Sequence, residues 1–222
     1  ENNKVRTESK EDAIEVDRLT QKAWVGHPHL YVLDNSTDFE GKMSRLVDII
    51  SKIVGLPSNL KRRSAKFLLR SKPDYTKFPN DFQVFDVEKV YLRKLHPETT
   101  YSFIRRRTSV DPTTNKKLGS VYQITNVKRV LESGEVVELK RIINKRDYED
   151  GYQIRDRKRH IVQQRRISFL YEKQSFTIHI YLAPVSDVYI LHAQVQAKNG
   201  PEPEVELPPF LNVERILHDT PE

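Results

Sequence analysis

The sequence has no cysteine, which excludes disulfides and thiolate metal sites. No run approaches roughly 18 consecutive apolar residues, which argues against a membrane-spanning helix. The first twenty positions are charged rather than apolar, so they do not resemble a secretory signal. These absences favour a cytosolic protein. Because the chain begins with Glu1, we also expect it to be a fragment or a trimmed product.

The sequence also lacks a GxxxxGK run, whose backbone amides would cradle nucleotide phosphates. Any ATP or GTP binding by such a loop would therefore need residues outside this chain. What the chain does have is positive charge. Its 38 Lys and Arg residues exceed its 31 Asp and Glu residues, giving a net charge of +7. This balance favours anionic partners such as nucleic acid, inositol lipids or polyphosphates.

Residues 1–72 are expected to form an incomplete α/β segment. The polar stretch 1–23 predicts a frayed surface helix, and the apolar run 28–35 predicts a short buried strand. Thr37 and Glu40 have the spacing of a capping box, which predicts that a helix begins there and ends before Gly55. One buried strand and one amphipathic helix cannot bury a core alone, because such a strand needs neighbours on both sides.

From Phe82 onward the hydrophobic pattern has a period of two, typical of strands. Seven such runs predict an α+β chain with a mostly antiparallel β barrel or tunnel over 82–218. The break between Asn144 and Gly151 predicts a short helix. We also expect a helix or linker at 60–72 and a last helix opened by Pro209. The predicted strands are 82–93, 100–109, 120–131, 135–143, 160–172, 174–184 and 187–197.

Most of the positive charge lies on these strands. Between Tyr101 and Leu170 the chain has seventeen basic and eight acidic residues. Residues two apart on a strand share a face, so Arg105 and Arg107 are predicted to point one way and Arg106 the other. An ordinary solvated barrel surface would explain any one of these arginines. The whole set favours an anion site, because a solvated face normally mixes both signs of charge.

Several strand segments together resemble the CYTH domain of adenylate cyclase and thiamine triphosphatase relatives. The segments, in chain order, are FDVEKVYLR, FIRRR, ELKRI, QQRRISFLYEKQSFTIHIY and ILHAQVQ. The preceding HPHLYVLDNSTDFEGKMSRL resembles the end of the NadR-type P-loop domain in the TRPL translocation-defect proteins. The resemblance implies two parts: a P-loop remnant over 1–72 and a CYTH-like tunnel over 82–218.

The resemblance also implies which residues line the tunnel. Catalytic CYTH members have an ExExK motif on the first strand, where this chain has Asp86 and Glu88 but Val90 in place of the lysine. Later carboxylate positions hold Lys140, His179 and the pair His192 and Gln194. The arginines instead match the phosphate-gripping positions. The resemblance implies this role for Arg105, Arg107 and Arg165, and the candidate phosphate- or lipid-binding set also includes Lys128, Lys140 and His179.

These features predict a module that binds phosphoinositide headgroups or other polyanions and needs no cofactor. We expect it to belong to a cytosolic trafficking protein with peripheral membrane contact, and to be catalytically inactive. The alternative is a tunnel triphosphatase in which Asp86, Glu88 and Glu138 hold Mg²⁺ or Mn²⁺ against tripolyphosphate or an organic triphosphate. Nucleic acid is a third candidate with little support, since no RNA-binding signature accompanies the basic strands.

Overall fold

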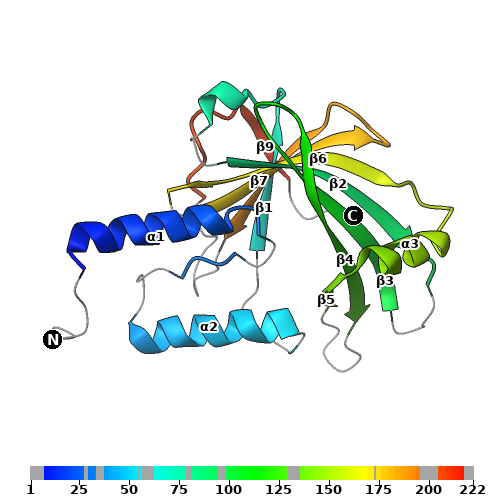
Figure 1. Cartoon of the computed structure of the whole chain (residues 1–222), viewed down its shortest axis with the longest axis horizontal. Coiled ribbons are helices and arrows are strands. Elements are labelled where there is room, and N and C mark those ends of the chain that lie inside the picture. The colour runs from blue at the N-terminus through cyan, green and yellow to red at the C-terminus, as the bar shows by residue number, and fades with distance from the viewer. Residues whose placement is uncertain are drawn as a thin grey trace.

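The chain is described by a computed structural model that covers residues 8–27, 30–33, 38–54, 56, 63–78, 82–94, 99–129, 136–172, 174–195 and 205–217. Its centre is a nine-stranded sheet, counted over these residues, in the order β5-β4-β3-β2-β6-β7-β8-β1-β9 (Figure 1). The elements are α1 (Lys10–Trp24), α2 (Phe39–Val54), β1 (Arg63–Leu69), the 3₁₀ helix η1 (Tyr75–Lys77), β2 (Phe82–Leu92), β3 (Thr99–Val110), β4 (Lys117–Arg129), β5 (Val136–Ile143), α3 (Lys145–Gln153), β6 (Val162–Tyr171), β7 (Gln174–Ala183), β8 (Tyr189–Val195) and β9 (Val213–Leu217).

Every neighbouring pair of strands in this sheet is antiparallel. The predicted mostly antiparallel architecture with few helices is therefore confirmed. The predicted barrel or tunnel does not close in the described residues: β5 and β9 are the two edges of the sheet, and no described residues pair them. The sheet is open because β9 extends the far edge next to β1 and does not return to β5.

The seven predicted strands correspond to β2 to β8, and the predicted short helix corresponds to α3. Two predictions were wrong. The basic segment 60–72 was expected to be a helix or linker, yet β1 pairs with β8 and β9. The last segment was expected to be a helix, yet β9 is an edge strand. In both cases pairing with a neighbouring strand outweighs the helical propensity of a short segment.

The division predicted between 1–72 and 82–218 runs through the sheet, because β1 lies in the first range and both of its partners lie in the second. Ala65, Phe67 and Leu69 of β1 alternate onto the face where the larger core lies. Their period of two was hidden in the sequence by the basic residues between and around them.

Two apolar clusters cover the same face of the sheet, which we call the outer face. The larger lies under η1 and the segment 205–213, and Phe169, Phe176, Ile178 and Leu191 are almost fully buried in it. The smaller lies under α3, where Tyr148 packs against Val90 and Ile104. These two coverings fix which side chains of each strand point outward.

The helices α1 and α2 precede β1 in the sequence and are seen at the left of Figure 1, whereas α3 is at the right. Ser9 caps α1 through a capping box with Asp12. At α2 the Asp38 carboxylate accepts from the Gly41 amide at 2.9 Å, so Asp38 acts as the cap, whereas Thr37 lies outside the described residues. No described helix is both long and apolar enough to cross a membrane.

The buried strand predicted at 28–35 is not seen where it can be checked. Residues 30–33 have no regular secondary structure, and the other four positions lie outside the described residues. The predicted helices are confirmed at Lys10–Trp24 and Phe39–Val54.

Candidate anion-binding face

The strand register assigns each side chain to one of two faces. Residues paired across neighbouring strands point to the same side of a sheet. Phe85 pairs with Arg166, which pairs with His179, and Lys89 pairs with Arg105. These residues alternate with the buried outer-face residues, so they lie on the opposite side. We call that side the inner face.

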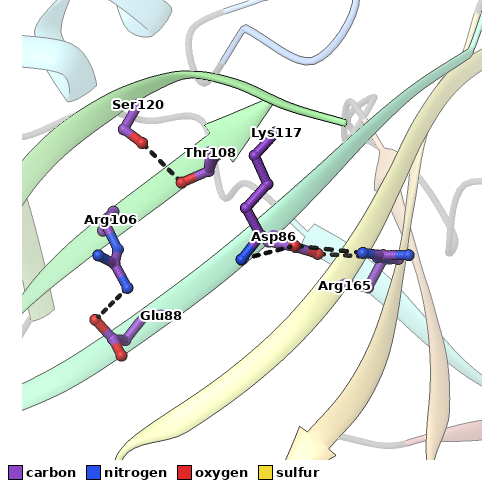
Figure 2. Close-up of polar contacts among 7 residues, drawn as sticks. All are labelled: Asp86, Glu88, Arg106, Thr108, Lys117, Ser120 and Arg165. Carbon is purple, nitrogen blue, oxygen red and sulfur yellow. Dashed lines mark hydrogen bonds and ion pairs between the residues drawn. The ribbon is translucent and has the colours of Figure 1, made fainter. Parts of the chain in front are cut away.

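Asp86 lies on the outer face, where cations surround it (Figure 2). Its carboxylate accepts hydrogen bonds from Arg165 Nε at 2.9 Å and from Arg165 Nη2 at 3.3 Å. Lys117 Nζ lies 3.9 Å from the same carboxylate. The hydrogen bond that Arg165 donates to Asp86 raises the pKa of Arg165, the expected result of a bidentate ion pair.

Glu88, two residues further along β2, is also paired on the outer face. Its Oε1 accepts from the Tyr148 hydroxyl at 2.7 Å and lies 3.1 Å from Arg106 Nη2 (Figure 2 draws the arginine contact). Burial and the hydrogen bond to Glu88 together raise the pKa of Tyr148 above its usual range. The carboxylate borders a pocket of about 340 Å³ under α3. Both β2 carboxylates are therefore already neutralised by arginine.

The inner-face arginines have neutral partners instead. Arg105 donates from Nη2 to Gln123 Oε1, and Arg107 donates from Nη1 to the carbonyl of Gly26. Neither forms an ion pair with a carboxylate in the part of the chain that the structure describes. Burial, followed by the charge of Arg107, lowers the pKa of Arg105 to about 10, so the guanidinium is still protonated at neutral pH.

The Gly26 contact brings the loop after α1 against the inner face. Gly26 has φ +80°, and a Cβ at this position would lie 2.5 Å from two ring atoms of Phe85. Only glycine suits both the backbone conformation and the space. The guanidinium of Arg107 lies over the Phe85 ring, 4.5 Å from its centroid. The loop and the aromatic ring thus hold Arg107 from two sides, and burial lowers its pKa.

Further cations share this face. Lys140 Nζ lies 2.6 Å from Glu138 on the same strand, and Arg166 donates to Gln164 Oε1 at 2.9 and 2.7 Å. Lys89 Nζ lies over the ring of Phe103, 4.3 Å from its centroid. Among the described side chains that β1 to β8 present inward, the cations are Lys66, Lys89, Arg105, Arg107, Lys140 and Arg166, and the carboxylate is Glu138.

Two histidines complete the inner face at β7 and β8. The rings of His179 and His192 stack with centroids 3.9 Å apart and planes 29° from parallel. Burial is the main cause that lowers both pKa values, with His192 at about 3 and His179 well below its usual value. Both rings are therefore neutral at physiological pH.

The structure brings together five of the residues named from the sequence: Arg105, Arg107, Lys140, Glu138 and His179 all lie on the inner face. It does not bring Arg165 or Lys128 to them. Arg165 lies on the outer face with Asp86, and its neighbour Arg166 takes the inward place. Lys128 follows the buried inward residue Val127 and so points to the other side of β4.

The three carboxylates of the triphosphatase hypothesis are not brought together. Asp86 and Glu88 point outward, whereas Glu138 points inward beside Lys140. The inward residues of β2 are instead Phe85, Val87 and Lys89, one position out of step with the alignment made from sequence. Over the described residues, no group of three or more His, Asp or Glu side chains is placed to hold a metal ion.

Four inner-face residues were missed or left without a role: Lys66, Lys89, Arg166 and His192. Lys66 lies on a strand that the sequence did not reveal, and Arg166 was exchanged for Arg165 by the register. Lys89 could have been found from the sequence, because it lies two residues after the apolar Val87 and so shares its face. In the structure its β3 partner is Arg105. A strand register fixed by the outward apolar residues would have found it.

Comparisons with known proteins add little to this geometry. No family model and no curated protein matches the chain. Two similar solved structures are described as the hypothetical protein NE1496 and the inorganic triphosphatase NE1496. Each is 15% identical with a TM-score of 0.43; they cover 69% and 68% of this chain and 88% and 84% of their own. At TM-scores below 0.5, neither likeness carries an argument about this chain.

The fold and the site define the class of this protein. It is an open antiparallel β-sheet protein with an apolar, helix-covered outer face and a cationic inner face.

Proposed function

We propose that the inner face binds a polyphosphate-type anion, with phosphoinositide headgroups as its expected occupants. One observation carries the proposal. Arg105 and Arg107 are adjacent on the inward side of β3, both are buried enough to lower their pKa values, and both bond to neutral acceptors. Partly buried guanidinium groups without an ion-paired carboxylate favour an incoming anion, because phosphate oxygens match their paired donors.

The placement of the other cations supports a multivalent ligand. Lys140 and Arg166 come from strands on either side of β3, and Lys66 comes from β1, near the far edge of the sheet. A single carboxylate or chloride would meet only part of this surface. An anion with several phosphate groups would contact several strands at once.

Binding is favoured over metal-dependent hydrolysis because of where the carboxylates lie. Asp86 and Glu88 are held in ion pairs on the outer face, so a divalent ion beside the inner arginines would have only Glu138 nearby. Mg²⁺ and Mn²⁺ prefer several hard oxygen ligands. The triphosphatase alternative would bind the same class of anion, and a phosphate-release assay distinguishes it from binding alone.

Titration calorimetry with tripolyphosphate at neutral pH, without metal, tests the proposal. We expect saturable binding that weakens with added salt, since charge interactions are screened over roughly 10 Å at 0.1 M. Arg105→Gln should weaken it, whereas Arg106→Gln, its outer-face neighbour, should not. Equal affinity of the two variants would refute the inner-face site.

Two further measurements distinguish the sources of the phosphate. Recovery with phosphoinositide liposomes but not with neutral ones in a flotation assay supports the lipid headgroup and, with it, peripheral membrane contact from the cytosol. Phosphate release from tripolyphosphate with Mg²⁺ or Mn²⁺, lost in Glu138→Gln, would support the triphosphatase instead. That this chain is part of a TRPL translocation-defect protein stays a prediction.

A further inference from the structure

The stacked histidines His179 and His192 lie in an unusual setting for neutral rings. Nε2 of His192 is buried and has no hydrogen-bond partner among the described residues. A buried polar atom left without a partner costs free energy, on the order of 1 to 3 kcal/mol. Both residues keep part of their surface exposed, although Nε2 of His192 itself is covered. A ligand at the exposed edge of the pair would satisfy this atom after a local shift of the side chains that cover it.

The charges that face the pair come from three strands. Arg166 of β6 is the cross-strand partner of His179, and Lys66 of β1 is the cross-strand partner of His192. Arg105 of β3 also acts on His179 across the inner face. From β2 the facing residue is the uncharged Phe85, which pairs with Arg166. The charged groups that act on the pair are thus all cations.

This arrangement makes protonation of the rings depend on what else is bound. With cations on several sides and little water, a positive imidazolium is disfavoured, and the pKa values of both histidines are lowered accordingly. An oxyanion placed against the rings reverses the local charge. A protonated ring donates from both Nδ1 and Nε2, so whichever nitrogen faces the oxyanion can donate to it.

We propose that a phosphate group of the bound anion lies against the His179–His192 pair, and that its binding brings one proton from solvent onto the pair. This inference rests on the proposed function and extends it: the stacked histidines form a proton-coupled subsite next to Arg166 and Lys66, on the same face of the sheet as Arg105 and Arg107. The chemical class of ligand is a tetrahedral oxyanion. A fully ionised anion gains a new charge-assisted hydrogen bond when the ring takes up the proton.

Coupling of this kind has a defined pH dependence. A proton bound only in the complex makes the affinity rise by about tenfold for each pH unit of acidification, below the histidine pKa of the complex and above that of the free protein. The free value is about 3 for His192. A phosphate ligand also titrates by itself near neutral pH, which would blur the result. Sulfate is therefore the better probe, because it does not titrate over the range of about pH 5 to 8 in which histidines do.

The experiment is titration calorimetry of the whole chain with sodium sulfate in two buffers of different ionisation enthalpy, at several pH values. The dependence of the measured heat on the buffer gives the number of protons taken up. We expect uptake approaching one proton per sulfate at mildly acidic pH. Sulfate binding without proton uptake would overturn the inference while leaving the proposed anion site intact. No binding of sulfate or of tripolyphosphate at any pH would remove the proposed function itself.

Variants assign the proton to the pair. His192→Gln and His179→Gln should each reduce the uptake and flatten the dependence of sulfate affinity on pH. His160→Gln, at an exposed histidine just before β6, is the matched control and should behave as the wild type. Unchanged uptake in both inner-face variants would contradict the assignment. The wild-type measurement decides the coupling itself, even if one variant fails to fold.

Discussion

The two faces of this sheet have arginines in similar numbers but hold them in opposite ways. On the outer face, Arg106 and Arg165 form ion pairs with Glu88 and Asp86. On the inner face, Arg105 and Arg107 donate to an amide and a backbone carbonyl. The comparison shows that the number of cations on a strand says little about anion binding. What matters is whether each cation already has a carboxylate.

Burial explains why the different pairing of the arginines on the two faces affects anion binding. The hydrogen bond to Asp86 raises the pKa of Arg165, whereas burial lowers that of Arg105. The charged form is thus stabilised by a partner on the outer face and penalised by desolvation on the inner face. An incoming polyanion would relieve that penalty. It would find no such advantage at the outer pairs.

The largest expected effect comes from removing both inner arginines. Arg105→Gln combined with Arg107→Gln should weaken tripolyphosphate binding by about a hundredfold or more, since each hydrogen bond to a charged group contributes about 1.5 to 3 kcal/mol. Calorimetry measures the affinity, and thermal unfolding checks the fold. The matched double variant, Arg106→Gln with Arg165→Gln, should keep its affinity within about twofold. A similar loss in both double variants would mean that the faces do not differ as described.

A second effect is on stability against pH. His179 and His192 have pKa values below the unfolded value of 6.5, so the unfolded chain binds more protons than the folded one between pH 6.5 and about 3. The stability that the two neutral histidines contribute to the folded state is complete above pH 6.5 and is lost as the pH falls. The free energy of unfolding should decrease by up to about 1.4 kcal/mol per pH unit for each histidine. Urea unfolding of His192→Gln should show a shallower pH dependence than that of His160→Gln.

The outer pairs should matter for stability rather than for binding. Asp86→Asn keeps the shape of the side chain but removes the charge that Arg165 and Lys117 face. Because this pair is only partly exposed, we expect a loss of about 1 to 2 kcal/mol in the free energy of unfolding. Tripolyphosphate affinity should be unchanged. A clear change in affinity would place Asp86 in the binding site and reopen the metal-dependent alternative.

The smallest expected effect is at the α3 covering of the outer face. Tyr148→Phe removes the hydroxyl that donates to Glu88 at 2.7 Å and leaves the buried ring in place. The loss should be about 1 kcal/mol in unfolding free energy. Urea unfolding measures it, with Tyr152→Phe on the same helix as the comparison. If both substitutions cost the same, the Glu88 contact makes no separate contribution.

The sequence predicted the seven central strands because their apolar residues recur with a period of two. It failed for β1, where basic residues around Ala65 and Phe67 hid the alternation, and for β9, a short edge strand that pairs only with β1. Such pairing between distant segments leaves little local signal. The alternation within single strands also did not indicate that the sheet has two open edges.

The candidate site was predicted in part, and the rest depended on register. On β3 the alternation around Arg106 was assigned correctly, so Arg105 and Arg107 were found. On β2 and β6 the assignment was one residue out, which exchanged Lys89 for Glu88 and Arg166 for Arg165. A shift of one residue turns every side chain of a strand to the other face. Only the positions of the two apolar cores decide between the registers.

The proposed difference between the faces is that inner-face arginines bind the anion and outer-face arginines do not. Side-chain NMR of the arginine Nε–H groups during titration with tripolyphosphate tests it most directly, because each guanidinium reports separately. We expect large, saturable shifts for Arg105 and Arg107 and unchanged signals for Arg106 and Arg165. Shifts confined to Arg106 and Arg165, or spread equally over all four, would contradict it.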